Sequence, residues 1–508
     1  MIIKKLSKFI VNLDYKDIPE TAINKAKLCF LDFLGVSNRG FYEESTQIAI
    51  KSINQLFDYD FKSETKKSSI IGNGYSNIAI AGFINGISAH VLDLDDGHRF
   101  AQIHPGAVVF PTAISIAEAN KIDGKKFLEA VVGGYEIAII LGKLANPYHR
   151  NQGFHTTGTI GTFTSGAVAS KLLNLNLEET INTLGLCGTQ SSGLLEVDHK
   201  GTMGKAFHAG KAVYNGILSG YLAKNGFTGP ESIVDGDEGF LKAMCIDFFK
   251  NLNNNLNYKD YLSSYLNENI GKFHIKEVYF KKYPFCRHIH SSIDAIFNIK
   301  NKYNFNVEDI EKIIVKTYKI ASEHNNFNPK NKEEIKQSLP YAIAVAIGNN
   351  YNYNLIDIIN IFNNEYTNNN IYNKEYNDNS TYNNEYNDNN IHNKKYNDNS
   401  TYNNEYVDIN NYNKKYIENI LNKIVIEENE EFTNITPKYR PSNVIIITKN
   451  GTFQDLVKLP LGEAETPLSD EDILKKFRLL NPNFDLEKLK PIQNIESYTI
   501  YDFMKNFH

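Results

Sequence analysis

The chain has 508 residues, of which 42% are hydrophobic, and a formal net charge of −5 at pH 7. This length predicts about two to four domains, and the acidic balance argues against a general nucleic-acid binder, which would carry a basic excess. The four cysteines form no CxxC pair, so the sequence shows neither a disulfide framework nor the usual zinc-finger or iron–sulfur spacings.

Neither the start of the chain nor its most apolar stretch resembles a membrane or export segment. Lys4 and Lys8 interrupt the first residues, and the apolar core of a secretory signal does not follow them. Residues 127–145 contain Glu129 and Glu136, which favours a buried helix over a membrane span of about 20 apolar residues. We therefore expect a soluble cytoplasmic protein with no membrane partner and no nucleic-acid partner.

Residues 1 to about 268 are predicted to be mainly helical. Pro19 suits a first helical position, and apolar residues recur after it at helical spacing. Three later helices, at 77–91, 158–170 and 211–226, are rich in glycine and alanine. Because glycine costs a helix about 1 kcal/mol relative to alanine, so many small residues predict close packing between helix backbones.

The pattern changes in the second half of the chain. Residues 310–320 and 443–459 alternate as strands do, and Asn450-Gly451 is a strong hairpin-turn signal. Residues 332–348 are predicted to be helical with an interruption at Pro340, and residues 468–480 are also predicted to be helical. Strands mixed with helices predict an α+β domain at this point.

We expect a mainly α protein in which an α+β domain is inserted into a discontinuous, all-helical domain. The predicted division is 1–268 for the first helical part, 269–460 for the α+β domain and 461–508 for the returning helical segment. Within the α+β domain, residues from about 363 to 415 are rich in Asn and Tyr, and block 371–390 recurs with four changes. Such a segment has too few aliphatic residues to offset its chain entropy. We expect a weakly ordered surface insertion, with a sticky interaction tract as the alternative.

The first chemically informative segment follows the helix at 77–91. Asp93, Asp95 and Asp96 stand close to His98 and His104. Carboxylates beside imidazoles suit acid–base work, because an Asp can orient a His and stabilise its protonated form. A solvated acidic loop is the alternative, and a metal site is less favoured because the spacing matches no EF-hand.

Two further clusters lie near predicted helix starts. His155 precedes two threonines that suit a helix N-cap, and a helix N-terminus favours anions. Lys205, His208 and Lys211 are spaced to share one helix face. On a tightly packed helix these cations would need an anion to offset their desolvation; on a surface helix they would simply be solvated.

The fourth cluster surrounds a YPFCRHIH motif. Lys281 precedes it, and Cys286, Arg287, His288 and His290 belong to it. Arg287 could lower the thiol pKa of its neighbour, although a single cysteine is more often a small buried hydrophobe. On a strand, the two histidines would face the same side. The four clusters together suit the binding of a small polycarboxylate and proton transfer on it.

These motifs resemble the MmgE/PrpD family, which includes 2-methylcitrate dehydratase, cis-aconitate decarboxylase and iminodisuccinate epimerase. The resemblance covers nearly the whole chain outside the Asn/Tyr-rich segment. It implies a large helical domain with a smaller α+β lid, a homodimer, an active site in the cleft between the domains, and no cofactor and no metal. The segments that carry it are DLDDGHRFAQIHPGA (93–107), GFHTTGTIGTF (153–163), GTMGKAFHAGKA (201–212) and YPFCRHIH (283–290).

By motif position, the resemblance places catalytic residues at Asp93, His104, His155 and Lys205. We expect His104 and His155 to transfer protons, with Asp93 orienting them or sharing that role. Lysines are expected to clamp the substrate's carboxylates. The residues expected to bind substrate are Lys281, Cys286, Arg287 and His208.

Two departures from the family pattern bear on the reaction. The decarboxylase branch has Thr after the DxDD segment and a second His in the YP segment, where this chain has Gly97 and Cys286. We therefore expect a hydro-lyase similar to 2-methylcitrate dehydratase, acting on a small polycarboxylate. The alternatives are an epimerase of a dicarboxylate such as iminodisuccinate, then a cis-aconitate decarboxylase-like enzyme, and last a non-enzymatic helical binding module.

Overall fold

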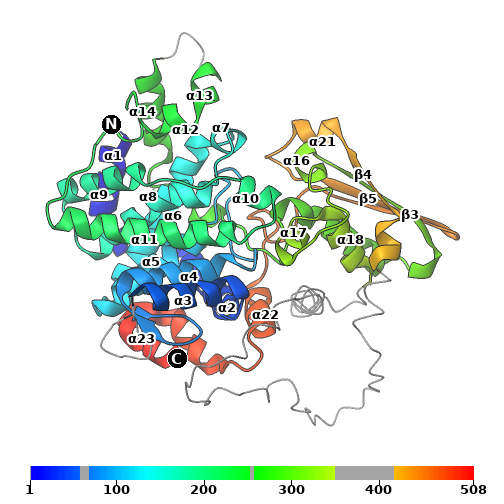
Figure 1. Cartoon of the computed structure of the whole chain (residues 1–508), viewed down its shortest axis with the longest axis horizontal. Coiled ribbons are helices and arrows are strands. Elements are labelled where there is room, and N and C mark those ends of the chain that lie inside the picture. Colours follow the sequence, from blue (N-terminus) through cyan, green and yellow to red (C-terminus); the bar gives the residue numbers. More distant parts are fainter. Residues whose placement is uncertain (1, 58–67, 252–256, 349–416, 508) are drawn as a thin grey trace.

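The computed structural model describes residues 2–57, 68–251, 257–348 and 417–507 (Figure 1). The Asn/Tyr-rich segment predicted at about 363–415 lies outside these residues. In the described residues, no helix is long and apolar enough to cross a membrane.

The first half of the chain forms a helical body, as predicted. The helix at Thr156–Leu172 (α8) is buried along its whole length, and the helices at Gly106–Ala119, Gly124–Ala145, Leu177–Thr189 and Gly204–Lys224 pack against it. The short strands β1 (Ser68–Ser69) and β2 (Tyr75–Ser76) form an antiparallel pair beside α4 and α5. The helices are α1 Ile2–Asn12, α2 Glu20–Gly40, α3 Glu44–Phe57, α4 Ile78–His90, α5 Gly106–Ala119, α6 Gly124–Ala145, α7 Tyr148–Asn151, α8 Thr156–Leu172, α9 Leu177–Thr189, α10 Glu196–His199, α11 Gly204–Lys224, α12 Phe240–Met244, α13 Ile246–Asn251 and α14 Tyr258–Asn269.

The expected close packing of glycine-rich helices is confirmed where α4 crosses α11. A Cβ built on Gly86 of α4 would lie 2.9 Å from the Cα of Gly210 in α11. Real Cβ atoms do not approach a backbone that closely, so a side chain here would push the two helices apart. This approach places the C-terminal end of α4, and the loop after it, against α11.

The second half contains a four-stranded mixed sheet, set to one side of the helical body (Figure 1). Its strand order is β4-β3-β5-β6, with β3 and β4 parallel and the other pairs antiparallel. The predicted hairpin is confirmed, because Thr448 pairs with Gly451 across the β5–β6 turn. The elements are α15 His290–Lys302, β3 Ile310–Thr317, α16 Lys319–Ser322, α17 Lys332–Lys336, α18 Leu339–Gly348, β4 Ile424–Glu428, α21 Glu430–Asn434, β5 Ser442–Thr448 and β6 Gly451–Val457.

A second apolar core lies under this sheet. Ile293 of α15 and Ile343 of α18 pack with Ile313, Val444 and Ile446, which the strands direct to one face. The alternation of buried and less buried residues along β5 is the period-2 pattern that the sequence predicted. The helix predicted at 332–348 is two helices, and Pro340 lies in the first turn of the second, where its missing N–H costs nothing.

The C-terminal segment returns to the helical body. α22 (Asp470–Leu480) packs on α2, where the ring of Phe477 covers Gly35 and Lys476 pairs with Asp32 at 2.6 Å. α23 (Ile500–Phe507) places Phe503 5.4 Å from the ring of Phe30. The exact domain boundaries at 268 and 460 stay a prediction.

Candidate active site

The loop between α4 and α5 carries the carboxylates of the first motif. Its residue Asp93 has a φ of 50°, in the left-handed region, which a residue other than glycine adopts only at some cost. This conformation accompanies burial of the Asp93 side chain, which is 3% exposed. The loop runs against α11 on one side and meets the segment before α15 on the other.

Two lysines converge on the carboxylate of Asp93. Lys205 Nζ, from the first turn of α11, lies 2.8 Å from Asp93 Oδ1, and Lys281 Nζ lies 2.7 Å from the same oxygen. Burial would raise the Asp93 pKa, but the two ammonium groups outweigh it and hold that pKa well below its usual range. The trio keeps one positive charge in excess, which favours an anion beside it.

The two lysines respond differently to this environment. Burial tends to lower the pKa of Lys205, but Asp93 reverses the effect and raises it above its ordinary value. Burial dominates for Lys281, whose pKa is lowered even though Asp93 opposes the change. Lys281 is the more deeply buried cation and also donates to the backbone carbonyl of Asp93 at 2.9 Å.

Histidines gather beside this trio. His104 lies with its Nδ1 2.7 Å from the backbone carbonyl of Asp96, which can only accept a hydrogen bond. Nδ1 therefore carries the proton, and Nε2 keeps a free lone pair. Burial lowers the pKa of His104 to about 3, despite Asp95, so the ring is neutral near pH 7. A neutral imidazole with a free Nε2 can act as a general base.

His155 lies at the N-cap of α8, as predicted, but its partner is another histidine. Its Nδ1 is 3.0 Å from Nδ1 of His208 on α11, and its ring stacks on that of His90 at 5.6 Å. Burial and these neighbouring rings hold the His155 pKa well below its ordinary value. His155 and His208 therefore share a single Nδ1 proton between two neutral rings.

The expected role of Asp93, orienting the histidines or sharing their proton transfer, stays a prediction, and its hydrogen bonds go elsewhere. Asp93 holds the two lysines, and its neighbour Asp95 binds His90 Nδ1 at 2.7 Å and lies 3.4 Å from His104 Nδ1. Burial raises the pKa of Asp96 to about 7, and this carboxyl serves the scaffold by accepting from Tyr135 and Gly106. The sequence alone could not assign three adjacent carboxylates to three different partners.

His90, Asp95 and His104 could also hold a metal ion. Their ligand atoms lie within 4.8 Å of one another, and they are the one such group in the described part of the chain. His90 and His104 each have a second ring nitrogen that is not used by these hydrogen bonds. The expected absence of a metal therefore stays a prediction.

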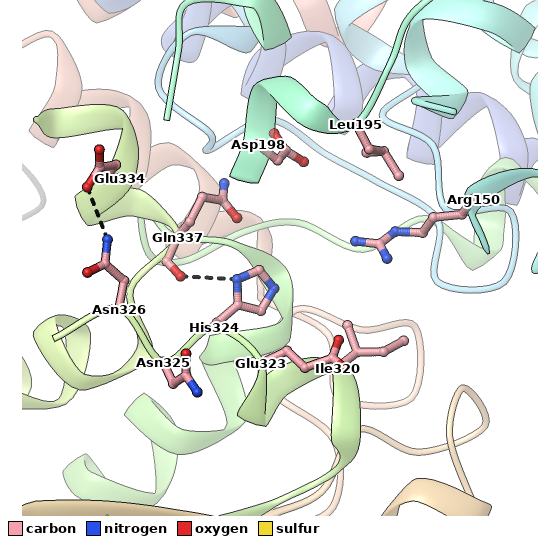
Figure 2. A pocket seen from close by; sticks show the side chains of 10 residues that line it. All are labelled: Arg150, Leu195, Asp198, Ile320, Glu323, His324, Asn325, Asn326, Glu334 and Gln337. Carbon is pink, nitrogen blue, oxygen red and sulfur yellow. Dashed lines mark hydrogen bonds between the residues drawn. The ribbon is translucent and has the colours of Figure 1, made fainter. Parts of the chain in front are cut away.

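A cavity of about 150 Å³ lies between the helical body and the α+β part. Figure 2 shows Arg150, Leu195 and Asp198 on its helical side, facing His324 and Gln337 from the α+β part. Gln337 connects the cavity to the site, because its Nε2 lies 3.4 Å from Asp93 Oδ2.

Cys286 has an unpredicted partner at this cavity. Its Sγ is 3.6 Å from Nε2 of His324, whose Nδ1 lies 3.0 Å from the backbone carbonyl of Gln337. Burial would raise the Cys286 pKa, but His324 outweighs it and lowers that pKa to about 7. The neighbouring Arg287, which the sequence offered as one explanation for a lowered thiol pKa, is not among the main causes. His324 stands in no recognisable motif, so only the fold reveals the pair.

Arg287 is engaged by the protein itself. Its guanidinium binds the carboxylate of Glu463 at 3.1 Å and the carbonyl of Leu461 at 2.9 Å. Arg99 and Arg440 also approach Glu463, and three buried guanidinium groups thus face one buried carboxylate. The charge of Arg287 is therefore neutralised by Glu463, although the sequence predicted that Arg287 would bind substrate.

Arg440 differs from the other two in its ion pairs. Arg99 and Arg287 both pair with glutamates, whereas Arg440 has no ion pair among the described residues. It is 4% exposed, and its Nε and Nη1, like those of Arg99, have no hydrogen-bond partner in the described part of the chain. Its guanidinium lies 5.8 Å from the ring of Tyr279. Arg440 belongs to no motif that the sequence analysis identified. Because a buried charge needs a partner, Arg440 is suited to receive an anion.

The structure gives a steric reason for glycine at position 97. A Cβ built on it would lie 2.3 Å from the hydroxyl of Tyr279, whose backbone pairs with Gly97. The ring of Tyr279 thus fills the space that a larger residue at position 97 would need.

His288 and His290 do not lie on a strand, contrary to the conformation considered for them. Nδ1 of His288 lies 2.7 Å from the hydroxyl of Tyr318, and His290 is the first residue of α15.

The fold therefore brings most of the predicted residues into one region. Asp93, Lys205 and Lys281 form one ion cluster, His104 stands near it, and His155 contacts His208. Their catalytic and binding roles stay predictions.

Two family models match the chain. The MmgE/PrpD N-terminal domain matches residues 4–252, and the MmgE/PrpD C-terminal domain matches residues 283–350 and 401–496. These matches confirm the resemblance predicted from the motifs.

Curated relatives include both lyase types. A cis-aconitate decarboxylase-like protein of Aspergillus oryzae is 27% identical over 46% of this chain and 49% of its own length. The cis-aconitate decarboxylase of Aspergillus terreus is 25% identical over 66% of this chain and 69% of its own. A probable 2-methylcitrate dehydratase of Saccharomyces cerevisiae is 27% identical over 63% and 62%. The alignment thus spans about half of the first relative.

Proposed function

Because this chain belongs to the MmgE/PrpD family, we propose that it is a hydro-lyase that removes water from a small, citrate-like polycarboxylate. The observation that carries the proposal is the excess positive charge of the Asp93–Lys205–Lys281 cluster beside the neutral base His104. Relatives named as a 2-methylcitrate dehydratase and as cis-aconitate decarboxylases support the substrate class.

The chemistry explains why cations must meet the substrate. Removing a proton from a carbon next to a carboxylate creates an enolate-like species with two negative charges on neighbouring oxygens. Cations that already face this position stabilise the developing charge without reorganisation. Lys205 and Lys281 supply that charge, and Asp93 fixes both ammonium groups in place.

A polycarboxylate carries further negative charges that need their own partners. Arg440 offers two unpartnered, buried N–H groups in a cluster with more guanidinium groups than carboxylates. We assign this residue to a second carboxylate of the substrate. Bonds between charged groups in such a site contribute about 1.5–3 kcal/mol each, enough to set substrate preference.

His104 is assigned as the base that takes the proton from carbon. Its Nδ1–H is fixed by the Asp96 carbonyl, which leaves Nε2 to accept. The ring of His155 stacks on that of His90, and His155 and His208 hold a proton that can pass between their rings. We propose that His155 contacts the substrate and that His208 supports it.

The second candidate function is decarboxylation of cis-aconitate, favoured by the names of the Aspergillus relatives. Gly97 and Cys286 favour dehydration, since the decarboxylase branch has a hydroxyl and an imidazole at these positions. Epimerisation, in which a proton leaves the carbon and another is returned to its opposite face without loss of a group, is the third. The homodimer and the cytoplasmic location stay proposals.

One experiment separates these reactions. The purified protein is incubated in deuterated water with citrate, 2-methylcitrate, cis-aconitate and an aspartate-derived imine, and followed by proton NMR. An alkene formed from a hydroxy acid supports dehydration. Loss of carbon dioxide supports decarboxylation, and deuterium exchange alone supports epimerisation.

A further inference from the structure

The site contains a thiol–imidazole pair that the mechanism above leaves unused. Cys286 Sγ lies 3.6 Å from His324 Nε2, and His324 Nδ1 lies 3.0 Å from the Gln337 carbonyl. Because a carbonyl only accepts, His324 Nδ1 carries a proton and Nε2 faces the sulfur. A second group thus orients the imidazole toward the thiol, which is the arrangement that activates a cysteine.

A second cysteine–histidine contact in the same chain shows that proximity alone does not produce such a pair. Cys245 Sγ lies 3.9 Å from His149 Nδ1 inside the helical body. There, burial raises the Cys245 pKa to about 12 and lowers the His149 pKa to about 4. At Cys286 the direction is opposite, since the thiol pKa falls to about 7 and that of His324 rises.

The difference lies in the charged surroundings. His324 and Lys205 lower the Cys286 pKa, whereas burial and Asp93 raise it. His324 is one of the residues that line the cavity between the helical body and the α+β part, and Cys286 is only partly buried. The titratable and charged groups that act on the pair from the elements around it are Asp93, Lys205, Lys281, Arg440, Tyr318, Arg150, Asp198 and His288, whose ring stacks on that of His324 at 5.9 Å.

We propose that Cys286 and His324 form the general acid of the reaction, delivering their shared proton to the leaving hydroxyl of the substrate. This role rests on the proposed dehydration. The pair touches Asp93 through Gln337, so it stands beside the same lysine cluster that would hold the substrate's carboxylate. In this proposal Cys286 supplies the thiol, and His324, from the α+β part, supplies the imidazole.

The step balances without any co-reactant. His104 Nε2 accepts the proton from carbon, and the electrons of that C–H bond become the new C=C bond. The C–O bond breaks with its electron pair on oxygen, and the proton from the Cys286–His324 pair completes a water molecule. The pair is then one proton poorer and His104 one proton richer. Exchange with solvent, through the cavity that His324 lines, restores both.

The first test reads the pair without any turnover. The rate of iodoacetamide alkylation at Cys286 is measured against pH by mass spectrometry, with buried Cys29, Cys187 and Cys245 as internal references. We expect an inflection near pH 7 in the wild type, and one shifted toward about 8.5, the ordinary thiol value, in His324→Gln. A saturating tricarboxylate should slow alkylation of the wild type at least fivefold.

The second test separates removal of the C–H proton from loss of the hydroxyl. In deuterated water, Cys286→Ala and His324→Gln should lose water elimination by about a hundredfold or more. Their deuterium exchange at carbon should stay within about fivefold of the wild type, because His104 is intact. His104→Asn should lose both, and the control Cys245→Ala should lose neither. Thermal melts of each variant establish that it is folded.

Three results would overturn the proposal. The first is a wild-type inflection near 8.5 that His324→Gln does not move. The second is elimination by both variants within about threefold of the wild type. The third is exchange lost in proportion to elimination, which would put Cys286 on the C–H proton. Failure of the proposed function looks different: the inflection near 7 persists, but no polycarboxylate protects Cys286 or is converted.

Discussion

Asp93 Oδ1 and Lys281 Nζ lie 2.7 Å apart although 188 residues separate them in the chain, and neither side chain is more than 3% exposed. The aspartate follows α4 of the helical body, and the lysine precedes the first helix of the α+β part. This ion pair therefore fixes, at the place where the two parts meet, the charge that we propose faces the substrate. The Asp93–Lys205–Lys281 cluster thus both joins the two parts of the chain and carries the charge that the proposed chemistry needs.

Replacing Lys281 should weaken substrate binding while the fold is kept. In Lys281→Met, Asp93 retains Lys205 as a partner, so no carboxylate is left buried without a cation. Losing one charged hydrogen bond of about 1.5–3 kcal/mol should raise KM about tenfold or more. The neighbour Lys282, which stacks 5.4 Å from the Tyr283 ring, offers a matched control. Steady-state kinetics in which Lys281→Met and Lys282→Met behave alike would contradict the assignment.

The base is tested by an isosteric change at position 104. His104→Asn keeps an N–H that can donate to the Asp96 carbonyl but removes the free Nε2. We expect kcat to fall about a hundredfold or more, with KM changed by less than threefold. His98 serves as the control, because its ring nitrogens contact Glu277 and the Ala101 N–H and are thus already used. A His104→Asn enzyme with at least a third of the wild-type kcat would rule out the role.

Arg440 should contribute affinity in proportion to the number of carboxylates. Arg440→Gln leaves Glu463 paired with Arg287 and Arg99, so the local cluster stays neutralised. Calorimetric titration should show about tenfold weaker binding of an unreactive tricarboxylate and a smaller loss for a dicarboxylate. Exposed Arg478, on the outer face of α22, provides the control substitution Arg478→Gln. Equal losses for both ligands would place Arg440 outside the binding site.

Gly97 and Tyr279 should be coupled in stability. Gly97→Ala places a methyl group 2.3 Å from the Tyr279 hydroxyl and should lower Tm. Tyr279→Ala removes the obstacle, so the double variant should be less destabilised than the sum of the two single changes. A thermal double-mutant cycle is expected to give a coupling of about 1 kcal/mol or more. Additive effects would show that the ring does not limit position 97.

A buried carboxyl outside the site should make stability depend on pH. Glu118 accepts hydrogen bonds from the Ser69 N–H and hydroxyl, and burial raises its pKa from 4.5 to about 7. A raised carboxyl pKa gives stability that is fully present below about pH 4.5. That stability, about 3 kcal/mol, is lost as pH rises through about 7.

The variant Glu118→Gln removes this titration while keeping a polar partner for Ser69. Its Tm relative to the wild type should therefore increase by about 2 °C or more between pH 5 and pH 8. Exposed Glu431, changed to Gln, should show no such trend. Parallel Tm curves for Glu118→Gln and wild type across this range would refute the pKa assignment.

The fold could be predicted well from local patterns. Helical spacing, the glycine-rich contacts and the Asn450-Gly451 turn each depend on residues close in the chain, and the structure confirms them. The strand assignment considered for His288 and His290 failed because a short 3₁₀ turn and the start of α15 occupy that segment. Alternation over so few residues does not distinguish these conformations.

The site was predicted less completely, and for a different reason. The motifs singled out Asp93, His104 and Lys205, but they could not show which carboxylate pairs with which cation. Asp93 meets lysines rather than a histidine. His324 and Arg440 reach the site only through tertiary packing, from the segment after α16 and from the segment before β5. Single residues brought in by the fold leave no local pattern to read.

The most direct test of the account is proton NMR of the wild-type enzyme in deuterated water with 2-methylcitrate, citrate and cis-aconitate. The account predicts a new alkene signal from a hydroxy acid, with one water lost per turnover and no carbon dioxide released. Carbon dioxide released from cis-aconitate, with every hydroxy acid left intact, would contradict it.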